Sequence, residues 1–467
     1  MKKIQLYTII GSVMLLGSVT SCQVVNKYRR PDVNLNALYR DATAGDTTSI
    51  ATIPWEHYFA DTVLQNLIHE GLDNNFDLQI AYTRIKQAEA NLLVARSAYF
   101  PTVALAGQVT HTRLSDGAQG KDVLGYHTND FRLGITAQWE ADIWGKLNRQ
   151  HRAQYAAMLN SYAYRDLIQT SLIANIANSY YALQALDEQL RITRQTVGLL
   201  QESTATIEAL LQAGMQNSAA VEQSKALLYA TQAGIPDLES SIRQTENSLC
   251  VLVGRQPGAV ERTALHVTDV PQELRTGIPA QLLSCRPDVK QAELSFRSAF
   301  ELKNAAIAAF YPSITLNAGS ILGYDSGSFS HFFQPQNLLA NIIGGLTMPL
   351  FQGNKLRAQL KIAKAQQQEA LLNFRKTMLT AGQEVSDILY TFHSSLRKNE
   401  VRTKQIQSLR AAVYDTQELL KAGEANYTEV LSAEQNLLQA QLSQVSDKLQ
   451  QMQASVNLYR ALGGGME

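Results

Sequence analysis

Proline is absent from two long stretches of this 467-residue chain, residues 146–235 and residues 351–467. In the first stretch, apolar residues recur every seven positions, as at Leu183, Leu190 and Val197. A seven-residue apolar period is the pattern of a coiled-coil seam, and proline would break the helix that carries it. The sequence therefore predicts very long packed helices in both stretches.

Each long helix is expected to reverse direction at a glycine. A helix over residues 147–211 would be about 98 Å long at ~1.5 Å per residue, which far exceeds a globular core. Gly214 follows this helix, and Gly423 follows its counterpart in the second stretch. Because glycine readily adopts the left-handed conformation that ends helices, we predict a helical hairpin with its tip near each glycine.

The second half of the chain repeats the first. Residues 98–105 (AYFPTVAL) are echoed by residues 309–316 (AFYPSITL), an offset of 211. Residues 210–214 (LLQAG) recur as residues 419–423 (LLKAG), an offset of 209. Copies of about 210 residues are longer than the units of solenoid proteins, so the pattern indicates a tandem duplication of one large motif.

The first copy also contains two segments with the period of two that marks a strand with unlike faces, and the second copy repeats them more weakly, with a last strand that is apolar on both faces at several positions. In the first copy, Val103, Leu105 and Gly107 alternate with their neighbours. The expected strands span about 101–114 and 129–143 in the first copy, and about 312–324 and 337–350 in the second. Such strands are typical of outer-membrane barrels, and a small soluble four-stranded sheet is the alternative.

Four strands are too few to close a membrane barrel, because the smallest barrels have about eight. In lipid, an open sheet edge would leave backbone groups unpaired. A membrane location therefore requires several chains to share one barrel, which would have eight strands from two chains or twelve from three. The arithmetic does not choose between these numbers.

The N-terminus has the features of an export signal. Lys2 and Lys3 precede an uncharged stretch over residues 4–21, which is too short for a typical membrane span. The stretch leads into Cys22 through Val-Thr-Ser, which resembles a bacterial lipobox and implies that Cys22 is acylated. Several acyl chains hold a protein on a membrane without a spanning helix. An ordinary signal with a chance cysteine is the alternative.

These features divide the chain into five parts. They are a signal peptide over 1–21, a lipid-anchored N-terminal segment over 22–56, a first repeat over 57–260, an inter-repeat linker over 261–285 and a second repeat over 286–467. The expected fold is mainly α with a small β part. It consists of tandem-duplicated coiled-coil hairpins and four membrane β-strands.

Composition and motifs argue against several other functions. The 41 basic residues balance the 41 acidic ones, so the chain lacks the basic footprint of a nucleic-acid-binding protein. Three cysteines are too few for a disulfide framework or a four-cysteine zinc site, and the eight histidines show no metal-binding spacing. Glu140 and Asp142 lie beside Trp144, where a structural corner is favoured over acid/base chemistry. We therefore expect no enzyme activity, no bound metal and no cofactor.

Three motifs resemble the TolC-like outer-membrane efflux proteins, in particular their lipoprotein (NodT-type) branch. Trp139–Lys146 and Met348–Phe351 resemble the two strand-to-helix corners of that branch, and Ile278–Val289 resembles its inter-repeat motif. The likeness covers nearly all of the mature chain. It implies a homotrimer with a twelve-strand barrel in the outer membrane, a long helical barrel in the periplasm and an equatorial collar.

The same resemblance implies that the protein is the passive exit duct of a tripartite efflux pump. It would dock a periplasmic adaptor that links it to an inner-membrane pump, and it would export drugs or other small molecules. Two alternatives stay open. One is a duct for type I protein secretion in the same fold, and the other is a pore-free coiled-coil envelope lipoprotein, against which the amphipathic strand pairs argue.

The resemblance also assigns roles at the periplasmic end. The candidate adaptor-docking residues lie at the hairpin tips: Leu211, Ala213, Gly214, Leu420, Ala422 and Gly423. Glu429 matches an acidic position whose ring narrows the periplasmic mouth of the family, and such a ring favours cations. Ser432 stands where a second acid is expected, so the ring would be thinner. The family's first tip aromatic and a nearby arginine are replaced by Leu211, Leu420 and Ala425.

Overall fold

The computed structural model describes residues 27–31, 49–117, 126–265 and 285–466. The signal peptide, Cys22 and most of the predicted linker lie outside the described residues. The chain divides into two compact units, which we call the sheet unit (residues 1–32, 85–161 and 292–374) and the hairpin unit (residues 33–84, 162–291 and 375–467).

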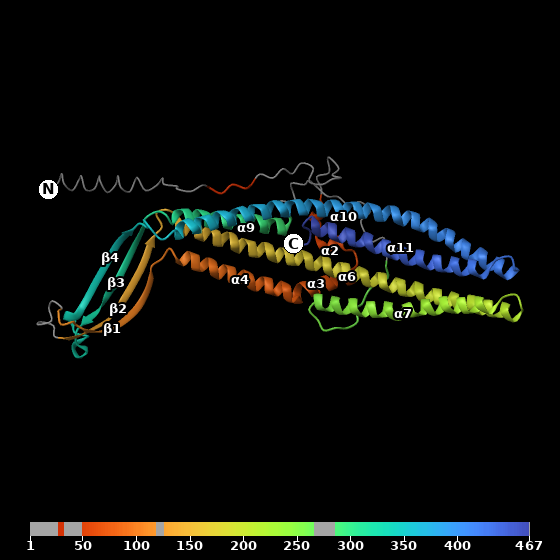
Figure 1. Cartoon of the computed structure of the whole chain (residues 1–467), viewed down its shortest axis with the longest axis horizontal. Coiled ribbons are helices and arrows are strands. Elements are labelled where there is room, and N and C mark those ends of the chain that lie inside the picture. Colours follow the sequence, from red (N-terminus) through yellow and green to blue (C-terminus); the bar gives the residue numbers. More distant parts are fainter. Residues whose placement is uncertain (1–26, 32–48, 118–125, 266–284, 467) are drawn as a thin grey trace. The chain divides into compact units, whose positions relative to one another are not determined.

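The sheet unit contains a four-stranded antiparallel sheet in the order β1-β2-β3-β4 (Figure 1). The strands span Thr102–Arg113, His127–Ala141, Ser313–Ser326 and Leu338–Thr347. Gly134 lies opposite Gly323, where an added Cβ would approach Gly134 Cα to 2.6 Å, so the glycine pair permits a close strand contact. Within the described chain, β1 and β4 each pair with one neighbour, which leaves both edges of the sheet open.

One face of this sheet is apolar and exposed. Val103, Leu105 and Val109 of β1 are 63%, 73% and 70% exposed, respectively. The register continues the face across the sheet, because Leu105 lies opposite Ile135 and Ile135 lies opposite Leu322. Soluble monomers rarely expose a continuous apolar face, so this one indicates a surface that lipid or another protein covers.

Four helices have residues in both units: α4 (Phe76–Ser97), α6 (Lys146–Gln212), α9 (Pro287–Ala308) and α10 (Lys355–Ala422). Within the sheet unit, α6 and α9 are joined by polar contacts. Arg149 Nη1 donates to Glu301 Oε2 at 2.8 Å, and both side chains are buried. Two short 3-10 turns, η5 (Phe329–His331) and η6 (Pro335–Asn337), lie between β3 and β4.

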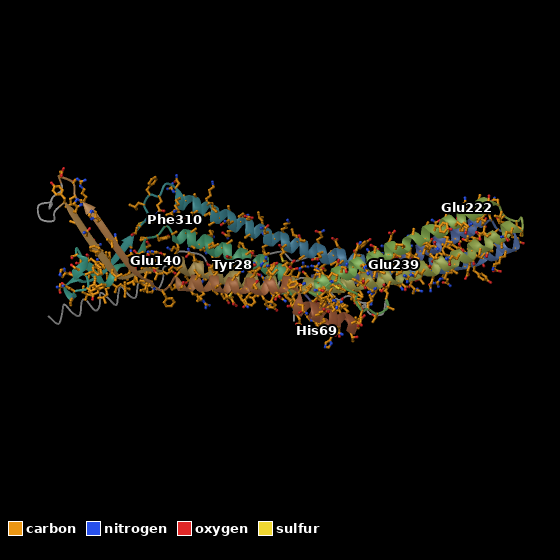
Figure 2. The ribbon with its side chains drawn as sticks, turned by 90° about the horizontal axis from the view of Figure 1, so that it is seen from below. Tyr28, His69, Glu140, Glu222, Glu239 and Phe310 are labelled. Atoms are coloured by element: carbon orange, nitrogen blue, oxygen red, sulfur yellow. The ribbon has the colours of Figure 1, made fainter. Side chains whose placement is uncertain are left out.

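The short segment 27–31 lies against α9 in the sheet unit. The side chain of Tyr28, labelled in Figure 2, donates to Glu293 Oε1 at 3.4 Å and meets the Phe300 ring edge-on at a centroid distance of 5.6 Å. Arg30 forms an ion pair with Glu293 at 2.7 Å. Burial and the Glu293 charge raise the pKa of Tyr28 to about 12, which keeps its hydroxyl a neutral donor. These contacts fix the chain shortly after Cys22.

The hairpin unit contains the remaining parts of the long helices and five further elements. These are η2 (Ile50–Thr52), α2 (Trp55–Tyr58), α3 (Thr62–Asn74), α7 (Ser218–Leu252) and α11 (Tyr427–Ala461). Its main core gathers aromatic and aliphatic side chains from both copies, among them Phe59, Ile68, Tyr180 and Tyr459. Tyr58 of α2 stacks on Tyr459 of α11 at a centroid distance of 4.2 Å, so these two helices are packed together.

Burial along the long helices follows the heptad pattern. Leu183, Val197 and Thr204 are buried on α6, and Val445 and Met452 are buried on α11. These positions lie seven or fourteen residues apart along their helix, so on each helix they line one face, which is the seam of a coiled coil. The predicted mainly helical fold with long hairpins and four strands is confirmed. No helix in the described part of the chain is both long and apolar enough to cross a membrane.

Asparagines at equivalent positions start the two returning helices. Asn217 Oδ1 accepts a hydrogen bond from the Ala220 N–H at the start of α7, and Asn426 Oδ1 accepts one from the Thr428 N–H at the start of α11. These side chains satisfy N–H groups that have no partner within the helix. The two asparagines are 209 residues apart, the same offset as the tip glycines.

Candidate functional site

The first hairpin tip is a tight turn built on Gly214. The residue has a φ of +75°, in the left-handed region. Its N–H donates to Leu211 O at 3.0 Å, and the next N–H, of Met215, donates to Leu210 O at 2.9 Å. This bonding satisfies the last carbonyl groups of α6 and ends the helix, as glycine does at many helix C-termini.

The second tip has the same geometry. Gly423 has a φ of +77°, and its N–H donates to Leu420 O at 3.1 Å. The Glu424 N–H donates to Leu419 O at 2.9 Å. The duplicated sequence LL-x-AG thus forms the same turn twice within the hairpin unit.

The two tips are joined by a small apolar cluster. It consists of Ile207, Ala220, Val221, Leu420, Val430 and Leu431, with Leu211 partly buried against it. Leu420 is 4% exposed and so holds the tips together, whereas Ala213, Gly214, Ala422 and Gly423 are exposed. A Cβ on Gly423 would lie 3.9 Å from Met215 Cε, which places the exposed Met215 of one tip beside the turn of the other.

The two candidate gate residues lie on the first turns of α11. Glu429 and Ser432 are both exposed. An acid near a helix N-terminus is stabilised by the positive end of the helix dipole, so the charge of Glu429 is favoured where it stands. The structure therefore leaves both side chains accessible to solvent within the described chain.

A buried acid below the tips was not anticipated from the sequence. Glu434 on α11 is 6% exposed, and its Oε1 accepts a hydrogen bond from Gln417 Nε2 of α10 at 2.9 Å. Burial raises the pKa of Glu434, while hydrogen bonds from Gln417 and Ser203 oppose that rise. The equivalent position in the first copy, 209 residues earlier, is Lys225, which pairs with Glu208 at 2.8 Å. The repeats therefore differ in chemistry directly beneath their tips.

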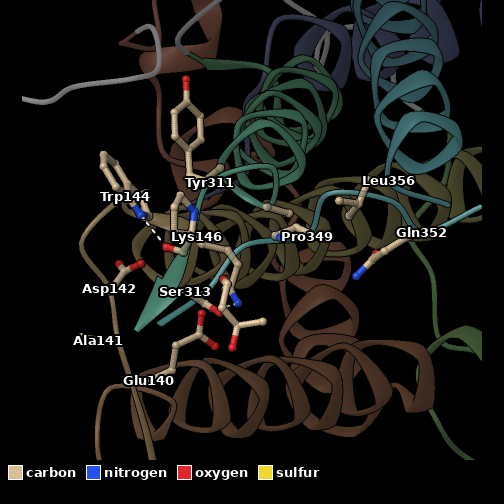
Figure 3. A pocket seen from close by; sticks show the side chains of 14 residues that line it. Glu140, Ala141, Asp142, Trp144, Lys146, Tyr311, Ser313, Pro349, Gln352 and Leu356 are labelled. Carbon is tan, nitrogen blue, oxygen red and sulfur yellow. Dashed lines mark hydrogen bonds and ion pairs between the residues drawn. The ribbon is translucent and has the colours of Figure 1, made fainter. Parts of the chain in front are cut away.

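The strand-to-helix corner of the sheet unit surrounds a cavity of about 230 Å³ (Figure 3). Lys146 Nζ lies 2.5 Å from Glu140 Oε1, and Trp144 Nε1 donates to Pro312 O at 2.6 Å. Asp142 accepts from the Leu147 and Asn148 N–H groups and so caps α6. The carboxylates of Glu140 and Asp142 are therefore both engaged in contacts that stabilise the corner. This favours a structural role for the motif over acid/base chemistry.

The sequence matches the outer membrane efflux protein family over residues 67–255 and 278–464, one match in each copy. The chain belongs to this family. Among similar proteins, a probable outer membrane lipoprotein, SilC of Salmonella typhimurium, is 28% identical over all of this chain and 99% of its own length. The cation efflux system protein CusC of Escherichia coli K12 is 26% identical over 96% of this chain and 97% of its own.

Solved structures of efflux channels share the fold. A crystal structure of CusC covers 95% of this chain and 100% of its own, with a TM-score of 0.84 and 26% identity. The open state of the MtrE outer membrane channel of Neisseria gonorrhoeae covers 96% and 99%, with a TM-score of 0.81 and 24% identity. The likeness extends over the whole efflux protein rather than over one repeat.

The comparisons confirm the predicted family, the efflux function and the outer-membrane location. The family is one of transport ducts and not of enzymes. The name of SilC also agrees with the predicted lipoprotein branch. The six tip residues and the two gate residues were selected from the sequence by resemblance. Met215 and Glu434 were missed because the pairing of the two tips is a tertiary contact that no local motif records.

Proposed function

We propose that this efflux protein is the passive outer-membrane duct of a tripartite pump, assembled as a homotrimer with a shared twelve-strand barrel. The observation that carries the proposal is the four-stranded sheet with two open edges and one exposed apolar face. In lipid, each open edge needs a partner strand, and neighbouring copies supply it when the barrel closes. Transport energy is then spent at the inner membrane, by the pump that the duct serves.

The lipid anchor at Cys22 belongs to the same proposal. Tyr28 is fixed on α9, and the six residues from Cys22 to Tyr28 reach at most about 20 Å when extended. Phe300, which Tyr28 contacts, lies eight residues before the end of α9, about 12 Å along the helix. An acylated Cys22 is therefore within reach of the end of α9 that leads into β3, where the barrel enters the membrane.

The native mass of the acylated protein in mild detergent tests the assembly. We expect a mass of three chains, because twelve strands close a barrel and four do not. Native mass spectrometry of protein extracted from outer membranes gives the answer directly. A monomer would leave both sheet edges open and would contradict the duct, whereas two chains would indicate an eight-strand barrel and contradict the trimer.

The exposed tip surface of Ala213, Gly214, Ala422 and Gly423 is the proposed adaptor-docking site. Replacing Gly214 by leucine adds a side chain where nothing lies within 4 Å, so the side chain meets no neighbouring atom, and the positive φ costs about 1–2 kcal/mol of local strain. We expect about ten- to thirty-fold weaker adaptor binding, equivalent to about 1.4–2 kcal/mol. Cross-linking to the adaptor and drug-resistance assays measure the loss.

A matched variant separates the docking surface from the turn. Asparagine tolerates the left-handed conformation, so Gly214→Asn keeps the turn while it adds a shorter side chain. Both variants should still form the trimer. Full cross-linking and resistance in Gly214→Leu would rule out docking at this tip.

Glu429 is the proposed charge of the periplasmic mouth. Three copies in a trimer would form an acidic ring, which attracts cations and repels anions. Glu429→Gln should therefore lower the cation preference of single channels, measured as a shift of the reversal potential toward zero in a salt gradient. Glu424→Gln, which neutralises an exposed acid in the adjacent tip turn, is the control. An equal reversal potential in Glu429→Gln and the wild type would argue against the ring.

A further inference from the structure

Two histidine side chains meet across the β1–β2 pair in the sheet unit. In the register, His111 lies opposite Asn129, and His127 lies two residues from Asn129 on the same face of β2. His127 Nδ1 is 3.3 Å from His111 Nε2, and the two rings stack with a centroid distance of 5.3 Å and an interplanar angle of 20°. Residues that are sixteen apart in the sequence thus bring two ring nitrogens together.

A neighbouring amide orients the first of these rings. His111 Nδ1 lies 2.7 Å from Asn129 Oδ1. A carboxamide oxygen accepts hydrogen bonds and does not donate them, so Nδ1 of His111 carries the proton in this contact. The other nitrogen, Nε2, then carries a lone pair that faces His127 Nδ1 and accepts its hydrogen bond in the metal-free protein. Metal-binding histidines are characteristically oriented in this way, by a hydrogen bond from the nitrogen that does not bind the metal.

The distance between the two nitrogens fits a shared metal ion. Two metal–nitrogen bonds of about 2.1 Å that meet at a tetrahedral angle place the nitrogens about 3.4 Å apart. The observed separation is 3.3 Å, between His111 Nε2 and His127 Nδ1. We propose that these two histidines form a binding site for a divalent transition metal ion of the zinc and copper class, with water at the remaining positions.

The ligand chemistry selects this class of ion. Neutral imidazole suits zinc, copper and nickel, whereas magnesium and calcium prefer oxygen ligands. The described residues include no cluster of three or more histidine, cysteine or acidic side chains that could hold a metal, so the described part of the chain contributes two ligands to the site. Arg113 lies opposite His127 in the register and is exposed, so its flexible side chain can keep its charge in water beside the ion.

Copper binding to the full acylated protein tests the site. Cu²⁺ is the probe because it binds nitrogen ligands most tightly among these ions and reports the number of bound nitrogens in its paramagnetic resonance spectrum. Metal-free protein in detergent should take up one Cu²⁺ per chain with two histidine nitrogens bound. The double variant His111→Gln/His127→Gln should bind at least about tenfold more weakly and lose the two-nitrogen signal.

Two further variants sharpen the result. Asn129→Ala removes the orienting amide and should weaken binding by about tenfold while both imidazoles remain. His393→Gln removes an exposed histidine of α10 and should change nothing. Should the double variant fail to assemble, His127→Gln alone should show one bound nitrogen. Equal affinity and an unchanged spectrum in the histidine variants, or no two-nitrogen signal in the wild type, would overturn the site without bearing on efflux.

Discussion

Replacing Arg149 by methionine should lower the free energy of unfolding by about 3–5 kcal/mol. Arg149 and Glu301 are 7% and 2% exposed, and their charged groups lie 2.8 Å apart between α6 and α9. Methionine removes the positive charge and leaves the Glu301 carboxylate buried without its ionic partner. An isolated buried charge costs far more than a lost surface contact, because water no longer solvates it.

Denaturant melts of the purified protein, followed by helical circular dichroism at one protein concentration, measure this change. The double variant Arg149→Met/Glu301→Leu should recover most of the loss, because it removes both charges together. Lys404→Met is the exposed control. It breaks a Lys404–Glu400 pair at 73% and 71% exposure and should cost less than about 1 kcal/mol. A single Arg149 variant as stable as the wild type would show that the pair is not desolvated.

The long helices could be predicted because their signals are local and repeated. The heptad at Leu183, Leu190 and Val197 defines a seam wherever a helix of that length forms, and proline would have interrupted it. Gly214 and Gly423 could be recognised as turns because few other residues adopt their positive φ without strain. These features depend on residues that are close together in the chain, so they can be predicted from the sequence alone.

The contacts between distant segments could not be predicted in the same way. Leu420 was assigned by resemblance to the docking tip, yet its side chain is buried in the cluster that joins the two hairpins. Glu434 is an ordinary acid in the sequence and becomes a buried one only because α6 and α10 cover it. The His111–His127 contact depends on strand register. In each case the partner is chosen by packing rather than by spacing along the chain.

The two repeats share the backbone conformations that end their helices, but they differ in the chemistry of their side chains. Both copies end α7 or α11 on a glycine in the left-handed region, Gly254 or Gly463. Beneath the tips, however, the first copy has the half-buried Glu208–Lys225 pair, and the second has the buried Glu434. Both copies thus retain the glycines that the backbone conformation at the helix ends requires. Among the residues next to the two tips, the second copy encloses the acid Glu434 between α6 and α10.

Gly254→Ala and Gly463→Ala should each lower the free energy of unfolding by about 2–5 kcal/mol. An added Cβ would lie 2.5 Å from Asn74 O at Gly254 and 2.6 Å from Cys285 O at Gly463. Both glycines also have positive φ, +77° and +92°, where a side chain costs about 1–2 kcal/mol. Overpacking against a backbone that cannot move adds about 1–3 kcal/mol.

Gly198→Ala is the matched control, because it makes the same chemical change inside α6 where nothing lies within 4 Å. Alanine favours helix over glycine, so this variant should be more stable by up to about 1 kcal/mol. In denaturant melts at equal protein concentration, the midpoint of unfolding should therefore fall for Gly254→Ala and Gly463→Ala and rise for Gly198→Ala. If Gly254→Ala and Gly463→Ala were as stable as Gly198→Ala, the ends of α7 and α11 would not pack against Asn74 and Cys285. A loss at both positions would show that each copy of the duplicated motif closes on the same glycine contact.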